Sequence, residues 1–207
     1  MRISEQAKQE NRGRILEKAA KLFCGKGFEA TTTRDIALAA GLATGTMFNY
    51  FPSKETLAMT MVAEALSRGG DDYEQRRSGN EELAEELFLF IASGLRRLRP
   101  LRPFLGPVLE RSLSPFPRKT VCPEGEAARQ DHLAAVHRII GRHGFTTAPD
   151  YVAITIYWSL YLGVLAFWAS DESPNQEASR ALIDYSIRMF VQVISGSGPD
   201  GGGAHEA

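Results

Sequence analysis

The stretch from Thr44 to Phe51 (TGTMFNYF) carries side chains that suit the recognition of base pairs. Asparagine can pair with the edge of adenine, threonine offers a hydroxyl and a methyl group, and glycine lets a backbone approach closely. On a helix with about 100° per residue, Gly45, Thr46 and Asn49 lie on one side. The spacing therefore favours a short helix whose polar side enters the major groove of DNA.

Met47 and Phe51 lie together on the other side of this helix and should face a core. A helix this short is not stable alone, so neighbouring helices must hold its apolar side. Polar groups around it could hold phosphates from the margins. These additional predicted DNA contacts are Thr32, Thr33, Arg34, Thr44, Tyr50 and Lys54. The residue types alone leave open an ordinary helical hairpin whose polar face is merely solvated.

Two helices are expected before this stretch. Apolar residues between Ile15 and Phe23 recur at helical spacing, and the glycines at 25 and 27 then end the first helix. A capping-box-like pattern, Thr32-x-x-Asp35, starts a second helix at Thr33–Ala40. Gly41 then allows a sharp turn. The second and third helices thus have the dimensions of a helix-turn-helix.

The rest of the chain is also helical in pattern. Pro52 should end the third helix, because a residue before proline is pushed out of the helical region, and Ser53 should cap a longer fourth helix. Further helices are expected at about 80–99, 103–113, 123–143, 149–170 and 174–195. A Pro-rich connection covers residues 114–123, and residues 196–207 are expected to be a disordered tail. The predicted fold class is all-α.

Composition is that of an ordinary soluble protein, and no pattern indicates export or an enzyme. Residues 1–56 carry nine Lys/Arg and six Asp/Glu, a net charge of +3, whereas the remainder carries −4. This asymmetry gives weak support for a polyanionic partner of the first part. The polar N-terminus has no signal-peptide core, and the two cysteines lack metal-ligand spacing, so a cytoplasmic location is expected. No nucleophile elbow, phosphate-binding glycine loop or paired-carboxylate motif is present, and no cofactor is expected.

The motifs TTRDIA, AGLATGTMFNYF and PSKE together closely resemble the N-terminal DNA-binding domain of the TetR family of bacterial transcriptional regulators. The match covers about residues 12–57. The resemblance implies an all-α homodimer with an N-terminal three-helix helix-turn-helix domain, expected at residues 1–56. A C-terminal helical domain for effector binding and dimerisation is expected at residues 57–195. Such regulators usually repress transcription.

The sequence departs from the family pattern at three positions. Ala43 stands where the family commonly has a serine cap on the recognition helix, and this loss costs about 1 kcal/mol in typical cases. Thr44 could take over the cap. Phe48 stands where the family often has a phosphate-binding tyrosine, and Tyr50, at a position that is usually histidine, could compensate. These changes put individual contacts in doubt and not the class.

Two apolar segments suggest how the C-terminal helical domain could form a dimer. Residues 151–169 are hydrophobic all round, which fits a helix buried on every side better than a membrane span. Next in the chain, an apolar stripe at helical spacing comprises Ala178, Leu182, Tyr185, Met189 and Val193. The two segments could form a four-helix dimer interface, as the resemblance also suggests. Such a dimer would place its recognition helices about 34–36 Å apart and predicts a near-palindromic operator.

The C-terminal domain also contains residues that could line an effector cavity. An apolar or aromatic small molecule could contact Met61, Phe88, Phe104, Leu105, Leu109, His137, Trp158 and Tyr161, although most such residues are simply core. The histidines at 132, 137 and 143 do not have metal-ligand spacing, so no metal is expected. Two alternatives stay open: a helical dimeric adaptor without DNA binding, and a redox-sensing regulator built on Cys24 or Cys122.

Overall fold

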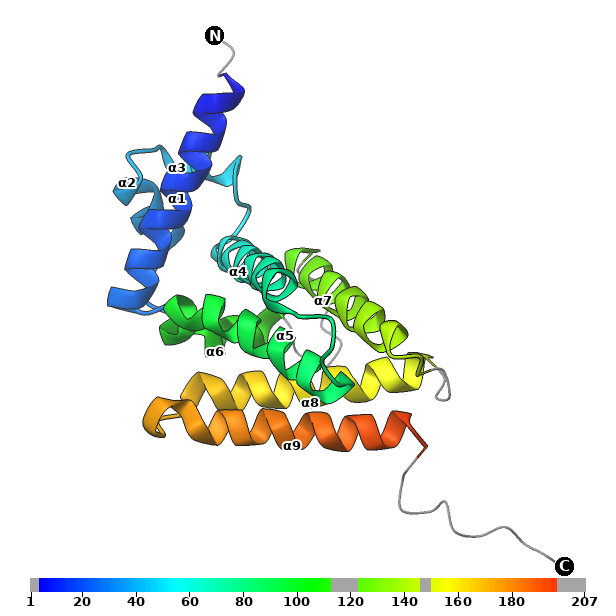
Figure 1. The fold of residues 1–207 in the computed structure, drawn as a ribbon. Coiled ribbons are helices and arrows are strands. Elements are labelled where there is room, and N and C mark those ends of the chain that lie inside the picture. The colour runs from blue at the N-terminus through cyan, green and yellow to red at the C-terminus, as the bar shows by residue number, and fades with distance from the viewer. Residues whose placement is uncertain (1–3, 113–122, 146–149, 197–207) are drawn as a thin grey trace, which may run out of the picture. The chain divides into compact units, whose positions relative to one another are not determined.

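A computed structural model describes residues 4–112, 123–145 and 150–196. Within these ranges the chain is helical and contains no strand, which agrees with the predicted all-α class (Figure 1). The α-helices are α1 Glu5–Lys26, α2 Thr33–Ala39, α3 Thr44–Phe48, α4 Lys54–Arg76, α5 Leu83–Leu98, α6 Arg102–Ser112, α7 Pro123–Arg142, α8 Asp150–Ser170 and α9 Glu177–Ile194. Two 3₁₀ turns cover Arg99–Leu101 and Pro174–Gln176.

These helices form two compact units. The first unit contains residues up to Ser67 together with Arg97–Arg129, and the second contains Arg68–Arg96 together with the residues from Gln130 onward. The division by compactness therefore falls eleven residues after the boundary expected from sequence at 56/57. That domain boundary stays a prediction. Each unit is described separately below.

In the first unit, α1, α2 and α3 pack on one another as the sequence predicts. Ile15, Ala19 and Phe23 form the buried face of α1. The Phe23 ring lies 5.0 Å from the Phe28 ring and 5.1 Å from the Phe104 ring of α6. This aromatic contact joins the start of α6 to the three-helix domain, so Phe104 belongs to the core of the first unit.

The turn between α2 and α3 follows directly from local sequence. Thr32 and Asp35 form the predicted capping box, with hydrogen bonds in both directions between side chains and backbone. At the other end of α2, Gly41 has φ +67° and its N–H bonds to the Leu38 carbonyl, while the Leu42 N–H bonds to the Ala37 carbonyl. These two bonds make a Schellman motif, which requires the left-handed conformation that glycine adopts easily.

In the second unit, α8 and α9 lie side by side (Figure 1). The buried face of α9 carries Ile183, Ile187, Phe190 and Ile194. A tight crossing joins α4 to α5, because a Cβ built on Gly69 would lie 2.7 Å from the Cα of Gly94. Only a glycine at position 69 allows this approach.

Several helix ends differ from the sequence-based expectation. The fifth helix begins at Leu83 and not near Asn80, because Glu81 accepts hydrogen bonds from the backbone N–H groups of Ser78 and Gly79 in a turn. The last helix begins at Glu177 and not at Pro174, because Asn175 and Gln176 have positive φ angles.

Other expected ends agree with the structure or fall outside it. The fourth helix is capped by Ser53, as predicted, through a bond from the Thr56 N–H to the Ser53 Oγ. The expected Pro-rich connection and tail, except for Pro123 and Gly196, lie outside the described residues, as does Pro149.

Candidate nucleic-acid interface

Helix α3 offers a polar surface and buries an apolar one, as its sequence predicts. Met47 is fully buried and Phe51 is 3% exposed, so both belong to the core of the first unit. On the other side, Gly45 and Asn49 are exposed and Thr46 is half-buried. Nothing within 4 Å meets a Cβ built on Gly45, so the backbone there is open to an approaching surface. The three residues predicted to contact base edges, Gly45, Thr46 and Asn49, are therefore accessible at the surface.

The prediction that this helix runs to Phe51 is wrong. Helix α3 ends at Phe48, and the chain continues through a turn in which the N–H groups of Asn49 and Tyr50 bond to carbonyls three residues earlier. Pro52 keeps Phe51 out of the helical region, and the backbone already tightens into this turn two residues earlier. The N-cap residue of α3, Ala43, makes no side-chain hydrogen bond, because a methyl group cannot accept one.

Lys54 is held by the first unit itself. Its Nζ donates to the backbone carbonyls of Phe28, Glu29 and Thr31 at 2.8, 3.2 and 3.2 Å. The same ammonium lies 4.5 Å from the centre of the Phe28 ring. An ammonium group has three donors, and these bonds use all of them. Phosphate binding by Lys54, which stays a prediction, would therefore require it to give up at least one of these bonds.

Tyr50 is anchored from α1 by a contact that the sequence did not indicate. The Asn11 Nδ2 donates to the Tyr50 hydroxyl at 3.2 Å, and the Arg14 guanidinium donates to the Asn11 Oδ1 at 2.6 Å. Tyr50 and Asn11 are half-buried, whereas Arg14 is exposed. No sequence pattern links these residues, because Asn11 and Tyr50 are 39 positions apart.

Arg12 contacts the segment that follows α3. Its guanidinium lies 5.7 Å from the centre of the Phe51 ring and donates to Glu64 of α4 at 2.8 Å. The contact fixes Phe51 between a cation and the core. Arg12 therefore connects α1, the segment after α3, and α4 within the first unit.

The remaining predicted DNA contacts lie at the start of α2 and α3. Thr32 and Arg34 are exposed, and Thr33 and Thr44 are half-buried. Beside them, a hydrogen bond from Lys26 and the bonds of the capping box lower the pKa of Asp35 to about 2. Asp35 is therefore ionised at neutral pH, and the salt bridge to Lys26 offsets its charge. All nine predicted DNA-binding residues belong to the first unit.

The predicted effector residues are divided between the two units. Met61, Phe104, Leu105 and Leu109 belong to the first, and Phe88, His137, Trp158 and Tyr161 belong to the second. His137 is exposed, whereas Trp158 and Tyr161 are buried. Whether any of them contacts an effector stays a prediction.

A small cavity lies between α5, α8 and α9 of the second unit. Its volume is about 10 Å³, about the space of one water molecule. It is lined by Ile91, Tyr157, Leu160, Tyr161, Val164, Ile183, Ser186, Ile187 and Phe190. Of the predicted effector residues, only Tyr161 lines it. A drug-sized molecule would have to displace these side chains to enter.

A buried aromatic cluster lies beside this cavity. His132 stacks on Tyr161 with ring centres 4.1 Å apart, and its Nε2 lies 2.9 Å from the Tyr157 hydroxyl. Burial lowers the pKa of His132 to about 3, so the imidazole is neutral at physiological pH. Among the described residues no group of three or more metal-binding side chains occurs. His132 is thus a core histidine with a polar partner.

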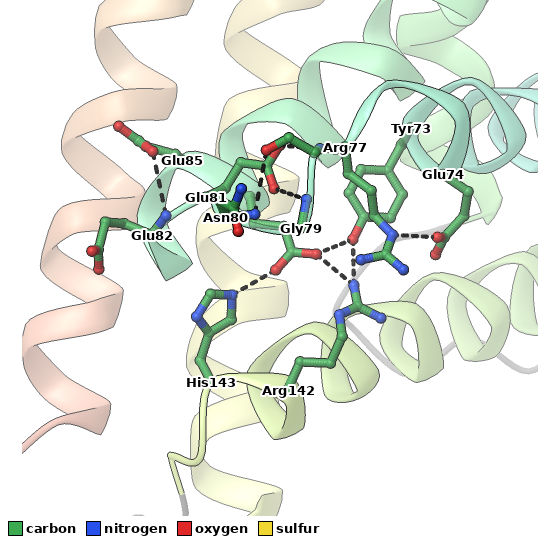
Figure 2. A network of polar contacts seen from close by, with 12 residues as sticks. Tyr73, Glu74, Arg77, Gly79, Asn80, Glu81, Glu82, Glu85, Arg142 and His143 are labelled. Carbon is green, nitrogen blue, oxygen red and sulfur yellow. Dashed lines mark hydrogen bonds and ion pairs between the residues drawn. The ribbon is translucent and has the colours of Figure 1, made fainter.

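A buried carboxylate joins three helices of the second unit (Figure 2). Glu86 of α5 accepts hydrogen bonds from the Tyr73 hydroxyl at 2.5 Å, from Arg142 at 2.6 Å and from the His143 Nε2 at 2.5 Å. Arg142 also bonds to the Tyr73 hydroxyl. Burial raises the pKa of Glu86, but these bonds outweigh it and hold the pKa below its ordinary value. The cluster links α4, α5 and the end of α7.

Two further sequence-based alternatives concern Cys24 and α8. Cys24 is exposed, and its Sγ lies 3.8 Å from the Pro100 carbonyl. Cys122 lies outside the described residues. One described helix, Tyr151–Ser170, is long and apolar enough to cross a membrane, and a third of its most apolar window is buried within the chain. Within the single chain Tyr151 and Phe167 are exposed, so burial of this helix on every side stays a prediction that depends on the expected dimer interface.

Comparison with known proteins gives matches at both ends of the chain. Residues 15–59 match the family described as bacterial regulatory proteins, tetR family, and residues 146–200 match a tetracyclin repressor-like C-terminal domain. The transcriptional repressor KstR of Rhodococcus jostii is 26% identical over 200 residues, which cover 95% of this chain and 88% of the relative. KstR2 of Mycobacterium tuberculosis is 48% identical over 46 residues, 22% of this chain and 23% of the relative.

Solved structures share the fold at lower identity. Thermus thermophilus FadR, a TetR family transcriptional repressor solved in complex with lauroyl-CoA, is 22% identical with a TM-score of 0.68. The match covers 95% of this chain and 97% of that one. A TetR transcriptional regulator from a Rhodococcus species has a TM-score of 0.69 at 18% identity, over 89% of this chain and 97% of that one.

Proposed function

Because the chain belongs to the TetR family of bacterial transcriptional regulators, we propose that it represses transcription by binding a near-palindromic DNA operator as a homodimer. A small apolar or aromatic effector releases the protein from DNA. The observation that carries the proposal is the surface of α3 and of the turn after it, where exposed Gly45 and Asn49 lie opposite buried Met47 and Phe51. This arrangement presents hydrogen-bonding groups on a helix that the core fixes in place.

Base recognition rests on Asn49, whose amide can pair with an adenine edge. The substitution Asn49→Ala should therefore relax the preference for one base position by about 1–3 kcal/mol. Asn80→Ala is a matched control, because Asn80 is exposed in the turn before α5. The measurement is a binding titration against an operator and its single-base variants. Equal losses on every variant would assign Asn49 to phosphate contact instead.

The operator can be found without knowing the regulated genes. The purified protein is incubated with sheared genomic DNA, and the retained fragments are sequenced. We expect enrichment of a near-palindromic site whose halves are about one helical turn apart. If the protein retains no sequence selectively, even at low ionic strength, the DNA-binding function is wrong and the adaptor alternative takes its place.

Dimerisation rests on the apolar surface that α8 and α9 leave exposed. On α9, Tyr185 is 67% exposed, Met189 46% and Val193 48%, and all three belong to the predicted stripe. Large exposed apolar side chains in a row are typical of an interface between subunits. Tyr151 and Phe167 add exposed aromatic rings on α8. A four-helix interface with a second copy would cover this surface.

A single charge tests this interface. Met189→Glu should shift the protein from dimer to monomer, because a carboxylate would be buried without a partner. Arg180→Glu places the same charge on the same helix at an exposed position on the side opposite Met189, and should leave the dimer intact. Sedimentation of both variants measures the outcome. A dimeric Met189→Glu protein would contradict the proposed interface.

The effector is expected to bind the apolar interior of the second unit. Tyr157, Tyr161 and His132 supply aromatic faces with a few polar groups, a mixture typical of ligand sites. Lauroyl-CoA, found in the Thermus thermophilus relative, has an apolar chain of this class and is a suitable first probe. Its addition should weaken DNA binding only if it binds one state more tightly than the other. A panel of aromatic acids tests whether the effector is aromatic instead.

A further inference from the structure

The donors and acceptors of Asn11, Arg14 and Tyr50 can be assigned from chemistry alone. A guanidinium only donates, so the Asn11 atom that faces Arg14 at 2.6 Å must be the carbonyl oxygen. The amide nitrogen therefore faces the Tyr50 hydroxyl at 3.2 Å. Because an amide NH₂ group also only donates, the Tyr50 oxygen is the acceptor in this bond. The phenol proton must then point away from Asn11.

This proton has no partner among the residues that the structure describes. Tyr50 is half-buried and immediately follows the exposed Asn49 at the end of α3. A DNA phosphate is an acceptor without protons of its own, and tyrosine hydroxyls are among the groups that bind phosphate oxygens. The outward proton of Tyr50 therefore has the polarity that a phosphate beside α3 requires.

We propose that Asn11 is a positioning residue for DNA binding: its amide holds the Tyr50 hydroxyl as an acceptor, so that the phenol proton is presented to a backbone phosphate. Without this bond the hydroxyl rotates between two orientations. Selecting one of them on binding then makes the free energy of binding less favourable. Arg14 fixes the orientation of the Asn11 amide. The proposal rests on the DNA-binding function above and explains how Tyr50 makes its predicted phosphate contact.

A double-mutant cycle tests the proposal on the full chain. The variants are Tyr50→Phe, Asn11→Ala and the combination of both, and the probe is a mixed-sequence DNA duplex of about three helical turns at low ionic strength. Loss of one hydrogen bond to a charged phosphate should weaken binding by Tyr50→Phe about tenfold. Asn11→Ala should weaken it about threefold to tenfold. In the Tyr50→Phe background, Asn11→Ala should cause no further loss.

Asn11→Asp provides a second variant of nearly the same shape. A carboxylate only accepts, so the Tyr50 proton would turn inward, and binding should be weaker than in Asn11→Ala. In the Tyr50→Phe background, the loss of affinity caused by Asn11→Asp beyond that of Asn11→Ala should be smaller. The loss that remains is the effect of the added negative charge. Thermal unfolding of each variant confirms that it is folded, and Asn11→Asp carries the test if Asn11→Ala does not fold.

Three results separate the outcomes. If the parent protein binds no duplex, the proposed function fails. If the parent binds, but the loss caused by Asn11→Ala is the same with and without the Tyr50 hydroxyl, the positioning role is wrong. The dependence of affinity on salt should stay unchanged in Tyr50→Phe and Asn11→Ala, because both replace neutral groups. A slope lowered by about one unit in Asn11→Ala would mean that Asn11 acts through the charge of Arg14, and would overturn the proposal.

Discussion

Each unit of this protein contains a charged side chain that makes three hydrogen bonds, and the partners differ in kind between the two. In the first unit, the Lys54 ammonium donates to three backbone carbonyls. In the second, the Glu86 carboxylate accepts from Tyr73, Arg142 and His143. The carbonyls are neutral dipoles that every sequence provides. The partners of Glu86 are specific side chains, one of which carries a permanent charge.

Burial decides how much each arrangement is worth. Lys54 is half-buried, so water can solvate part of its charge and of the carbonyls. Glu86 is 3% exposed, and Arg142 depends on it for a counter-charge within 2.6 Å. Arg142 is exposed to water, so the cost of losing the charge falls on the buried end of the cluster, where three hydrogen bonds would lose their charged acceptor. The second unit should therefore be more sensitive to loss of its central charge than the first.

The largest effect is expected from Glu86→Gln. The amide keeps the shape of the side chain, but its NH₂ group only donates and would face a donor where the carboxylate accepted, so the free energy of unfolding should fall by about 3 kcal/mol. Urea denaturation measures the change. Glu82→Gln is the matched control, because Glu82 is exposed one helical turn earlier, and it should change stability by less than about 0.5 kcal/mol. Equal effects at both positions would show that the cluster adds no stability.

Acid should remove part of this difference. The pKa of Glu86 lies below its ordinary value of 4.5 in the folded protein, so its stabilising effect is fully present above pH 4.5. It is lost as the pH falls through the folded-state pKa. The stability gap between the parent and Glu86→Gln should therefore be constant near neutral pH and shrink below about pH 4.5. A gap that widens on acidification would contradict this sign.

A smaller effect is expected from Lys54→Met, which keeps the length of the side chain and removes the ammonium. Three charge-assisted bonds and a cation–π contact disappear, but water can replace some of them. Stability in urea should fall by about 2 kcal/mol. Lys21→Met, at an exposed salt bridge on α1, should cost less than about 1 kcal/mol. If Lys54→Met is the more damaging of the two central substitutions, burial is not what separates the units.

Gly69→Ala tests whether the stability of the second unit depends on the close approach of two helices as well as on charge. Alanine normally stabilises a helix relative to glycine, but here its Cβ would overlap the backbone of Gly94. The helices must separate, and we expect a loss of about 1.5 kcal/mol. Gly70→Ala is the control, because a Cβ there meets nothing within 4 Å, and it should be neutral or stabilising. Thermal unfolding of the two variants gives the comparison.

Sequence patterns predicted the parts of the molecule that depend on near neighbours. The capping box of Thr32 and Asp35, the cap at Ser53 and the burial of Met47 and Phe51 are all confirmed. Each follows from residue types three or four positions apart, a separation that helix geometry fixes. The predicted end of α3 at Phe51 is wrong, because the backbone tightens into a turn at Asn49 and Tyr50 before the restriction by Pro52 begins.

Contacts between distant residues were not predictable in the same way. The bond between Asn11 and Tyr50 spans 39 positions, and that between Glu86 and Arg142 spans 56. Polar residues on a helix are usually solvated, so nothing in the sequence marks these particular ones as paired. The three carbonyls around Lys54 have no side-chain signature at all. Their identification required the packed arrangement of the helices.

The smallest effect is expected at the capping box, whose pattern the sequence shows most clearly. Thr32→Ala removes the acceptor for the Asp35 N–H and should cost about 1 kcal/mol in urea denaturation. Thr33→Ala is the control at the next position, where the side chain makes no capping bond, and should change stability by less than about 0.5 kcal/mol. This ranking would mean that the motifs most visible in the sequence direct the chain into its turns, while distant and less visible contacts supply more of the stability. A loss at Thr32 as large as that at Glu86 would reverse this conclusion.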